Sequence, residues 1–124
     1  MANLDKLSPT SVGRAGEFLT AYKFEMAGLE TIHSNTSCDL HVTLPSKRVL
    51  RVEVKSSLKP WRSGSFRFRR GKSDAQIFVF ACLPLNLIRV FSGYMLRDYK
   101  LVTLRPSEFT EQAEADDIAS LFLR

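Results

Sequence analysis

The sequence contains little cysteine and no long apolar run. Only Cys38 and Cys82 occur among its 124 residues, which excludes a disulfide framework and a zinc site built from four cysteines. We expect both thiols to be reduced core residues in a cytoplasmic protein. The longest apolar stretch, residues 77–85, contains Pro84 and is much shorter than the ~20 residues that span a membrane. Residues 1–5 lack the pattern of a secretory signal.

Acidic residues are scarce in one part of the chain. Between residues 47 and 72 Glu53 is the only acid, whereas ten residues are basic, so this segment carries a net charge of +9. The ten are Lys47, Arg48, Arg51, Lys55, Lys59, Arg62, Arg67, Arg69, Arg70 and Lys72. Such density, with Trp61, Phe66 and Phe68 interleaved, is typical of a surface that binds nucleic-acid phosphates. A solvated cationic surface and a face for an acidic protein are the alternatives.

Two helices are predicted, one near each end of the chain. Ser8 suits an N-cap, Pro9 a first turn and Gly28 a helix stop, so the first helix is expected over residues 9–26. Its apolar residues at helical spacing are Val12, Ala15, Leu19, Tyr22 and Met26. The second helix is acidic and is expected over residues 106–123. Its apolar contacts would be Phe109, Ile118, Leu121 and Phe122.

Apolar patterning predicts seven short strands between these helices. They are expected at residues 29–34, 38–44, 49–55, 65–69, 76–83, 87–91 and 101–104. The 76–83 strand is apolar without alternation, which is typical of a central strand buried on both faces. This order predicts an α/β fold in a single domain, residues 1–124, with a mixed β-sheet flanked by an N-terminal and a C-terminal helix.

Two acids and a lysine lie on neighbouring predicted strands. Asp39 lies on the 38–44 strand, and Glu53 and Lys55 share one side of the 49–55 strand because strand side chains alternate. Two carboxylates can hold a hard cation such as Mg²⁺. Such a cation polarises a phosphoryl oxygen and lowers the pKa of a bound water, and a lysine can position that water. The P-loop, dinucleotide-binding and serine-hydrolase motifs are absent.

The pattern Asp39 … Glu53-Val54-Lys55 resembles the PD-(D/E)xK nuclease signature. The segment Gly13-Arg14-Ala15-Gly16-Glu17 is similar to the first helix of the Holliday-junction-resolvase-like branch. Homing endonucleases of the same superfamily have a similar layout. The resemblance covers residues 12–57 and implies a restriction-endonuclease-like core with Mg²⁺- or Mn²⁺-dependent endodeoxyribonuclease activity. The chain departs from the family at Cys38, where proline is common, and it lacks a helix between Lys55 and the 76–83 strand.

The resemblance also implies roles for individual residues. Asp39 and Glu53 would bind the metal directly, the Val54 carbonyl would be a further ligand, Glu17 would bind through water, and Lys55 would orient the attacking water. DNA contacts are expected from Arg14, Lys47, Arg48, Arg51, Ser56, Ser57, Lys59, Arg62, Arg67, Arg69, Arg70 and Lys72. Because one such domain covers one scissile phosphate, cutting both strands implies a homodimer or a larger symmetric assembly. A non-catalytic nucleic-acid-binding module on the same fold is the alternative.

A cation shared by Asp39 and Glu53 and the apolar pattern both require the same register between the 38–44 and 49–55 strands. A hairpin loop with an even number of residues would place Asp39 opposite Val54, on the face away from Glu53. An odd loop would place Asp39 opposite Glu53 if it spans residues 45–47, and opposite Lys55 if it spans residues 46–48. It would also bring the apolar residues of both strands onto one face. We therefore predict an odd-length connection, or an even one corrected by a β-bulge.

Overall fold

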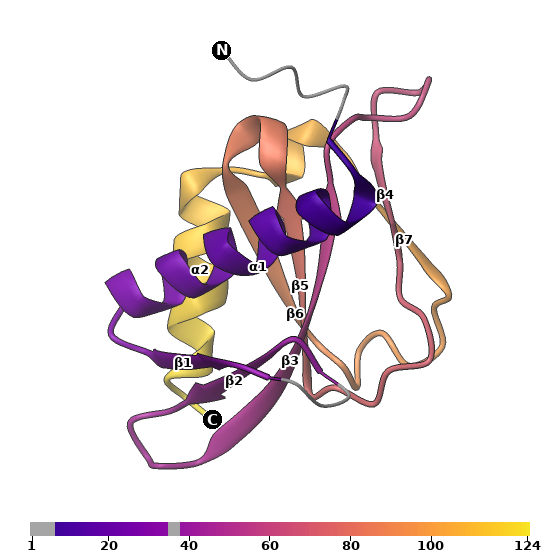
Figure 1. Cartoon of the computed structure of the whole chain (residues 1–124). Coiled ribbons are helices and arrows are strands. Elements are labelled where there is room, and N and C mark those ends of the chain that lie inside the picture. Colours follow the sequence, from indigo (N-terminus) through magenta and orange to yellow (C-terminus); the bar gives the residue numbers. More distant parts are fainter. Residues whose placement is uncertain (1–6, 35–37) are drawn as a thin grey trace.

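A mixed five-stranded sheet forms the centre of the molecule in this computed structural model, which describes residues 7–34 and 38–124 (Figure 1). The elements are α1 (Pro9–Met26), β1 (Glu30–His33), β2 (Leu40–Thr43), β3 (Val49–Ser57), β4 (Phe66–Arg69), β5 (Ile77–Cys82), η2 (Leu83–Leu85), β6 (Leu87–Ser92), β7 (Leu101–Leu104), η3 (Pro106–Glu108) and α2 (Glu111–Leu121). The sheet order is β1-β2-β3-β5-β6, and β4 pairs with β7 in a separate two-stranded ribbon. Within the described part of the chain, only β3 and β5 pair in parallel. The α/β fold with helices from both ends of the chain is thereby confirmed.

The sheet separates two apolar clusters. On one face, α1 covers β3 and β5 and α2 lies over β6, with Phe24, Ile118 and Leu121 packed against the inward side chains of the strands. On the other face, the β4–β7 ribbon contributes Phe66 and Phe68 to a second cluster. β5 is buried along its whole length, as its continuous apolar sequence predicts. The placement of Phe66 and Phe68 in this core excludes them as surface groups for stacking on bases.

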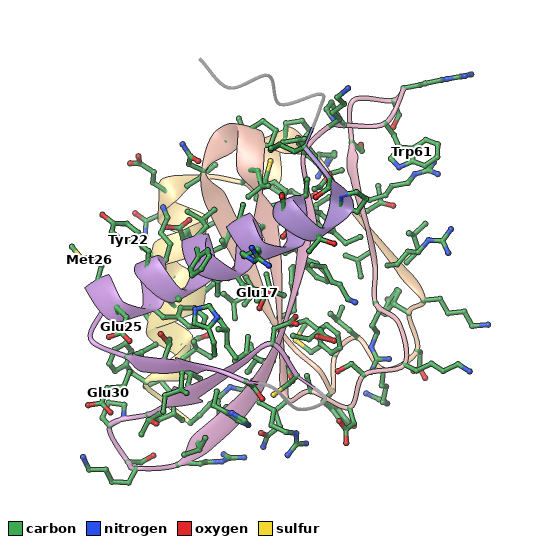
Figure 2. All side chains as sticks on the ribbon, viewed as in Figure 1. Glu17, Tyr22, Glu25, Met26, Glu30 and Trp61 are labelled. Atoms are coloured by element: carbon green, nitrogen blue, oxygen red, sulfur yellow. The ribbon has the colours of Figure 1, made fainter. Side chains whose placement is uncertain are left out.

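The buried face of α1 differs from the predicted one. Ser8 caps the helix by accepting a hydrogen bond from the Ser11 amide, as its position indicated. The buried residues, however, are Gly16, Thr20 and Phe24, while Tyr22 and Met26 are 60% and 72% exposed. Both lie on the part of α1 that faces away from the sheet (Figure 2). Of the predicted face, Leu19 does pack against the core. The rest of the prediction failed because small residues at helical spacing allow a close approach to the sheet, and hydrophobicity alone does not detect them.

The predicted second helix is shorter than expected. Residues Pro106–Glu108 form the 3-10 turn η3, and the chain becomes extended at Phe109 before Thr110 caps α2 through the Ala113 amide. Phe109 therefore packs with the ribbon, in the cluster on the opposite face from Ile118 and Leu121. Phe122, which follows the helix, is 41% exposed. The expectation of one apolar helix face was wrong because Thr110 interrupts the pattern.

Acidic side chains of α2 bind the outer edge of β6. The Glu114 carboxylate accepts the Ile88 amide at 2.9 Å, and Asp117 accepts the Val90 amide at 2.8 Å. Lys23 of α1 pairs with Glu114 at 2.8 Å. These bonds satisfy backbone donors that an edge strand leaves open. Part of the acidity of the C-terminal segment is thus used within the fold.

Candidate active site

The β2–β3 hairpin has the register that the chemistry requires. Thr43 pairs with Val49 and Leu40 with Val52, and Leu44 bonds Arg48 across the end of the ladder. The loop is therefore the three residues 45–47, with Lys47 in the left-handed region at φ 73°, as in three-residue hairpins that end in a bulge. Beyond Leu40 the Asp39 amide also donates to the Val52 carbonyl, at 3.0 Å, so both residues face Val52, as at a β-bulge, and the regular register ends there. The predicted odd-length connection is confirmed.

The ladder between β2 and β3 ends where the acids lie. Pairing stops at Leu40 and Val52. Beyond that point the Val54 amide donates to Oδ2 of Asp39 at 2.7 Å, rather than to a backbone carbonyl of β2. This bond fixes the Asp39 carboxylate against the edge of β3. The Val54 carbonyl points to the same side of the strand as its amide, so it lies at the edge where β2 has separated.

Burial and the neighbouring Asp39 raise the pKa of two carboxyl groups, Glu53 on β3 and Glu17 on α1. Burial raises the pKa of Glu53 to about 7, together with a hydrogen bond and charge repulsion from Asp39, while Lys55 opposes the shift. Partial burial, followed by the charge of Asp39, raises the pKa of Glu17 on α1. Glu17 lies near the middle of Figure 2. The helix, the hairpin and β3 thus bring together the acids that the sequence singled out.

The donor set fits a hard divalent cation held by two carboxylates. The Glu53 carboxyl, whose pKa burial and the neighbouring Asp39 raise, would be stabilised in its charged form by a cation between the two side chains. Mg²⁺ commonly binds one or two carboxylates and keeps several waters. Among residues 7–34 and 38–124, no three His, Cys, Asp or Glu side chains lie close enough to hold a metal by themselves. Asp39, Glu53 and Glu17 are the carboxylates in this region that could take part in such a site.

Lys55 and Ser56 point to opposite faces of β3. Lys55 shares the face of Glu53, and a methyl group added at Gly71 would lie 3.7 Å from its Nζ, so the segment after β4 borders the site. Ser56 lies under α1, where a methyl group at Gly16 would collide with its hydroxyl. That hydroxyl is buried, so the expectation that Ser56 contacts a DNA phosphate is wrong. Ser57 returns to the open face and donates to the Lys59 carbonyl at 3.2 Å.

The other residues predicted to contact DNA lie on several parts of the surface. Lys47 and Arg48 are at the hairpin tip, which Figure 1 shows on the opposite side of the view from the ribbon. Arg14 is exposed on α1. The remaining exposed residues of this set follow β3, lie on β4 or follow it: Lys59, Arg62, Arg67, Arg69 and Lys72. The basic segment is therefore continuous in sequence but divided in space.

Two arginines of the basic segment have partners within the protein. Arg51 donates to the Asp74 carbonyl at 3.2 Å, and Arg70 stacks over the Phe78 ring at 5.0 Å. The side chain of Gln76 accepts the Arg51 amide at 2.9 Å and so joins β5 to β3 beside the site. Sequence reasoning did not select Gln76. No local motif indicates its role, because that role depends on the parallel pairing of distant strands.

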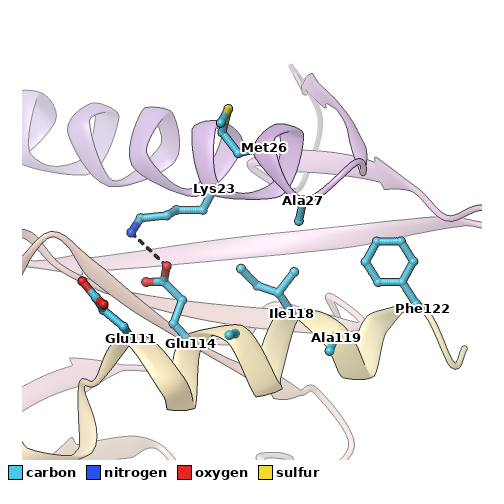
Figure 3. A pocket seen from close by; sticks show the side chains of 9 residues that line it. Lys23, Met26, Ala27, Glu111, Glu114, Ile118, Ala119 and Phe122 are labelled. Carbon is cyan, nitrogen blue, oxygen red and sulfur yellow. Dashed lines mark ion pairs between the residues drawn. The ribbon is translucent and has the colours of Figure 1, made fainter.

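A groove lies away from these acids. It has a volume of about 530 Å³ and lies between α1 and α2, with Met26, Ala27, Ile118 and Phe122 among its lining residues (Figure 3). Its lysine, Lys23, is already paired with Glu114. The groove therefore offers no arrangement for phosphodiester chemistry. Neither helix in the described part of the chain is long and apolar enough to cross a membrane.

The sequence matches no protein-family model and no curated protein. The fold resembles that of a bacterial homing endonuclease. The solved structure of that enzyme, I-Ssp6803I, matches with a TM-score of 0.70 and 21% sequence identity over 79% of this chain and 75% of the other. At this identity the likeness establishes a shared fold.

Proposed function

We propose that the protein is a Mg²⁺-dependent endonuclease that hydrolyses phosphodiester bonds of DNA. The observation that carries the proposal is the meeting of Asp39 and Glu53 at the point where β2 separates from β3, with Lys55 on the same face. The fold shared with a homing endonuclease supports the same activity class. The basic surface supports DNA as the substrate.

Each residue of the site has a distinct task in this mechanism. Asp39, Glu53 and the Val54 carbonyl would hold the cation, and Glu17 would bind it through water. When bound, the cation would polarise a phosphoryl oxygen and lower the pKa of a coordinated water. Lys55 carries no competing salt bridge among the described residues, so its ammonium group is available to orient the attacking water and to offset negative charge at phosphorus.

We further propose that the enzyme acts as a homodimer or a larger symmetric assembly. One chain contains one such set of acids, and one set acts on one scissile phosphate. Cleavage of both strands of a duplex requires a second site in the opposite orientation, which a two-fold axis provides.

A cleavage panel tests the nuclease function. Supercoiled plasmid, linear duplex, single strand and four-way junction are each incubated with Mg²⁺, with Mn²⁺ and with EDTA. We expect metal-dependent cleavage of at least one DNA, and its loss in Asp39→Asn and in Glu53→Gln. Both substitutions preserve side-chain shape, and the side-chain oxygen of the introduced asparagine can still accept the Val54 amide. Both variants should therefore remain folded and keep most of their DNA affinity.

The outcomes of this panel separate the competing functions. Cleavage at parental rates by both variants would overturn the assignment of the site. DNA binding without cleavage under any metal condition would identify a non-catalytic binding module on the same fold. The absence of DNA binding at low salt would favour an acidic protein as the partner of the basic surface.

A further inference from the structure

The β4–β7 ribbon presents an outer face unlike its inner one. Along β4 the buried residues Phe66 and Phe68 alternate with the exposed Arg67 and Arg69. Register places Thr103 beside Arg67 and Leu101 beside Arg69 on the neighbouring strand, and both are exposed. The outer face thus carries two guanidinium groups and two methyl-bearing side chains on a ribbon anchored by its inner aromatic residues.

The ribbon lies over the strand that carries the proposed catalytic residues. The Phe68 and Phe80 rings are 4.8 Å apart, and Phe80 is the neighbour of Lys55 in the parallel register of β3 and β5. The chain leaving β4 then passes Lys55 at Gly71. The ribbon therefore packs on the face of the sheet that carries Lys55, and the segment that follows it borders the site.

The two outward arginines are available to meet a ligand. Neither has a carboxylate partner among the described residues. Arg67 is instead held by the Trp61 ring, 4.2 Å from its guanidinium carbon. Trp61 is 55% exposed and lies on the loop beside the ribbon (Figure 2). This stacking limits the motion of the side chain without consuming its hydrogen-bond donors.

The dimensions of such a ribbon match the DNA major groove. A strand rises about 3.3–3.4 Å per residue, and base pairs along a DNA strand are about 3.4 Å apart. Alternate side chains of β4 therefore have the spacing of base pairs two steps apart. The major groove is about 12 Å wide and admits a two-stranded ribbon, where arginine bonds guanine and a methyl group contacts thymine.

We propose that the β4–β7 ribbon enters the major groove and determines sequence preference, with Arg67 and Arg69 each hydrogen-bonding a guanine two base pairs apart. The proposal rests on DNA as the substrate of the proposed nuclease. It assigns Arg67 and Arg69 a role different from that of a phosphate-binding cation, because phosphate contacts carry no sequence information.

Selection from a randomised duplex library tests the proposal on the full chain. Binding is selected in EDTA, so that no cleavage is needed, and the bound DNA is sequenced. We expect guanine at two positions separated by one base pair. Arg67→Ala and Arg69→Ala should each remove the preference at one position, by roughly 5- to 150-fold in relative affinity. Trp61→Ala should weaken only the preference read by Arg67.

Two variants keep the test specific. Arg67→Lys retains the charge but cannot form the same paired bonds, so it should lose guanine preference while keeping most affinity. Arg62→Ala removes an exposed cation outside the ribbon and should weaken all sequences equally. Melting curves check that each variant is folded.

The proposed role of the ribbon and the proposed nuclease function are tested by different measurements, base preference and DNA cleavage. If Arg67→Ala and Arg69→Ala lower affinity for all sequences equally, or if the wild type selects no guanine, the ribbon does not read bases. If the wild type selects guanines but cleaves no DNA, the reading role stands and the catalytic proposal fails. If it binds no DNA, both fail.

Discussion

At the residue scale, Asp39 has two connected roles. Its Oδ2 accepts the Val54 amide at 2.7 Å, replacing a bond that the ladder would otherwise supply. The same carboxylate contributes to the raised pKa of Glu53. The separation of β2 from β3 therefore creates the site and is stabilised by one of its acids. Asparagine at this position preserves the hydrogen bond but not the charge, so it separates the structural role from the proposed metal-binding role.

The Glu53 carboxyl predicts a pH dependence of stability in the absence of metal. Folding raises its pKa from 4.5 to about 7, so the folded state holds this proton more tightly than the unfolded state. The stabilising contribution is complete below pH 4.5, declines as pH rises to about 7 and is absent above that value. The melting temperature of Glu53→Gln relative to wild type should therefore increase between these limits.

Thermal melting at several pH values measures that difference. Glu30→Gln, which removes an exposed carboxylate on β1, is the matched control for loss of one charge. A difference between Glu53→Gln and wild type that stays constant from pH 4.5 to about 7 would contradict the prediction. Mg²⁺ should reduce the difference at high pH, because a cation stabilises the charged pair.

At the scale of the element, Gly16 permits the close packing of α1 on β3. A methyl group there would lie 2.9 Å from Ser56 Cβ and closer still to its hydroxyl, whereas one at Gly13 would meet nothing within 4 Å. We expect Gly16→Ala to destabilise the fold by about 1–3 kcal/mol, as overpacking does. Gly13→Ala should stabilise it by up to about 1 kcal/mol, because alanine favours helix.

Chemical denaturation measures both glycine variants. Gly16→Ala combined with Ser56→Gly removes the collision and should recover much of the lost stability. Because Glu17 follows Gly16, the single variant should also weaken metal-dependent cleavage. Equal stability of Gly16→Ala and Gly13→Ala would contradict the packing that places Glu17.

The hairpin loop predicts an effect of residue parity. Deleting Ser46 leaves a two-residue loop, which would force either the apolar face or the Asp39–Glu53 pairing out of register. We expect this deletion to lower the melting temperature strongly and to abolish cleavage. Inserting two glycines after Ser46 keeps the parity, and loop lengthening alone costs less than about 1 kcal/mol. Similar stability of the deletion and insertion variants would contradict the register argument.

The sequence predicts elements well where one local pattern determines them. Alternation located β2 and β3, and the shared parity of apolar and acidic positions determined their register. The buried face of α1 could not be obtained in this way, because Gly16 and Thr20 contribute by their small size rather than by hydrophobicity. The separate β4–β7 pairing was also missed, since it joins segments that are distant in the sequence. The same limit applies to Ser56, whose burial depends on a helix near the start of the chain.

At the scale of the whole molecule, the acidic residues of α2 and the basic residues between 47 and 72 differ in what they contact. Acids of α2 bind Lys23, Arg89 and the edge of β6, and so contribute to the fold. The basic residues between 47 and 72 mostly face solvent on the hairpin, the loop after β3 and the ribbon. Because these sites are dispersed, one duplex would contact only part of the set.

This distribution predicts a steep but limited salt dependence of DNA binding. If about five of the ten basic residues meet phosphates, the logarithm of the association constant falls against that of salt concentration with a slope of about −4 to −5. Fluorescence anisotropy with a labelled duplex in EDTA measures the slope. Lys72→Ala should reduce its magnitude by about 1, as loss of one phosphate contact does. Arg67→Ala should leave the slope nearly unchanged, because a base contact releases no counterion. A slope near zero in the wild type would show that the basic surface does not bind the DNA backbone. Equal slopes for wild type and Lys72→Ala would show that Lys72 does not contact a phosphate.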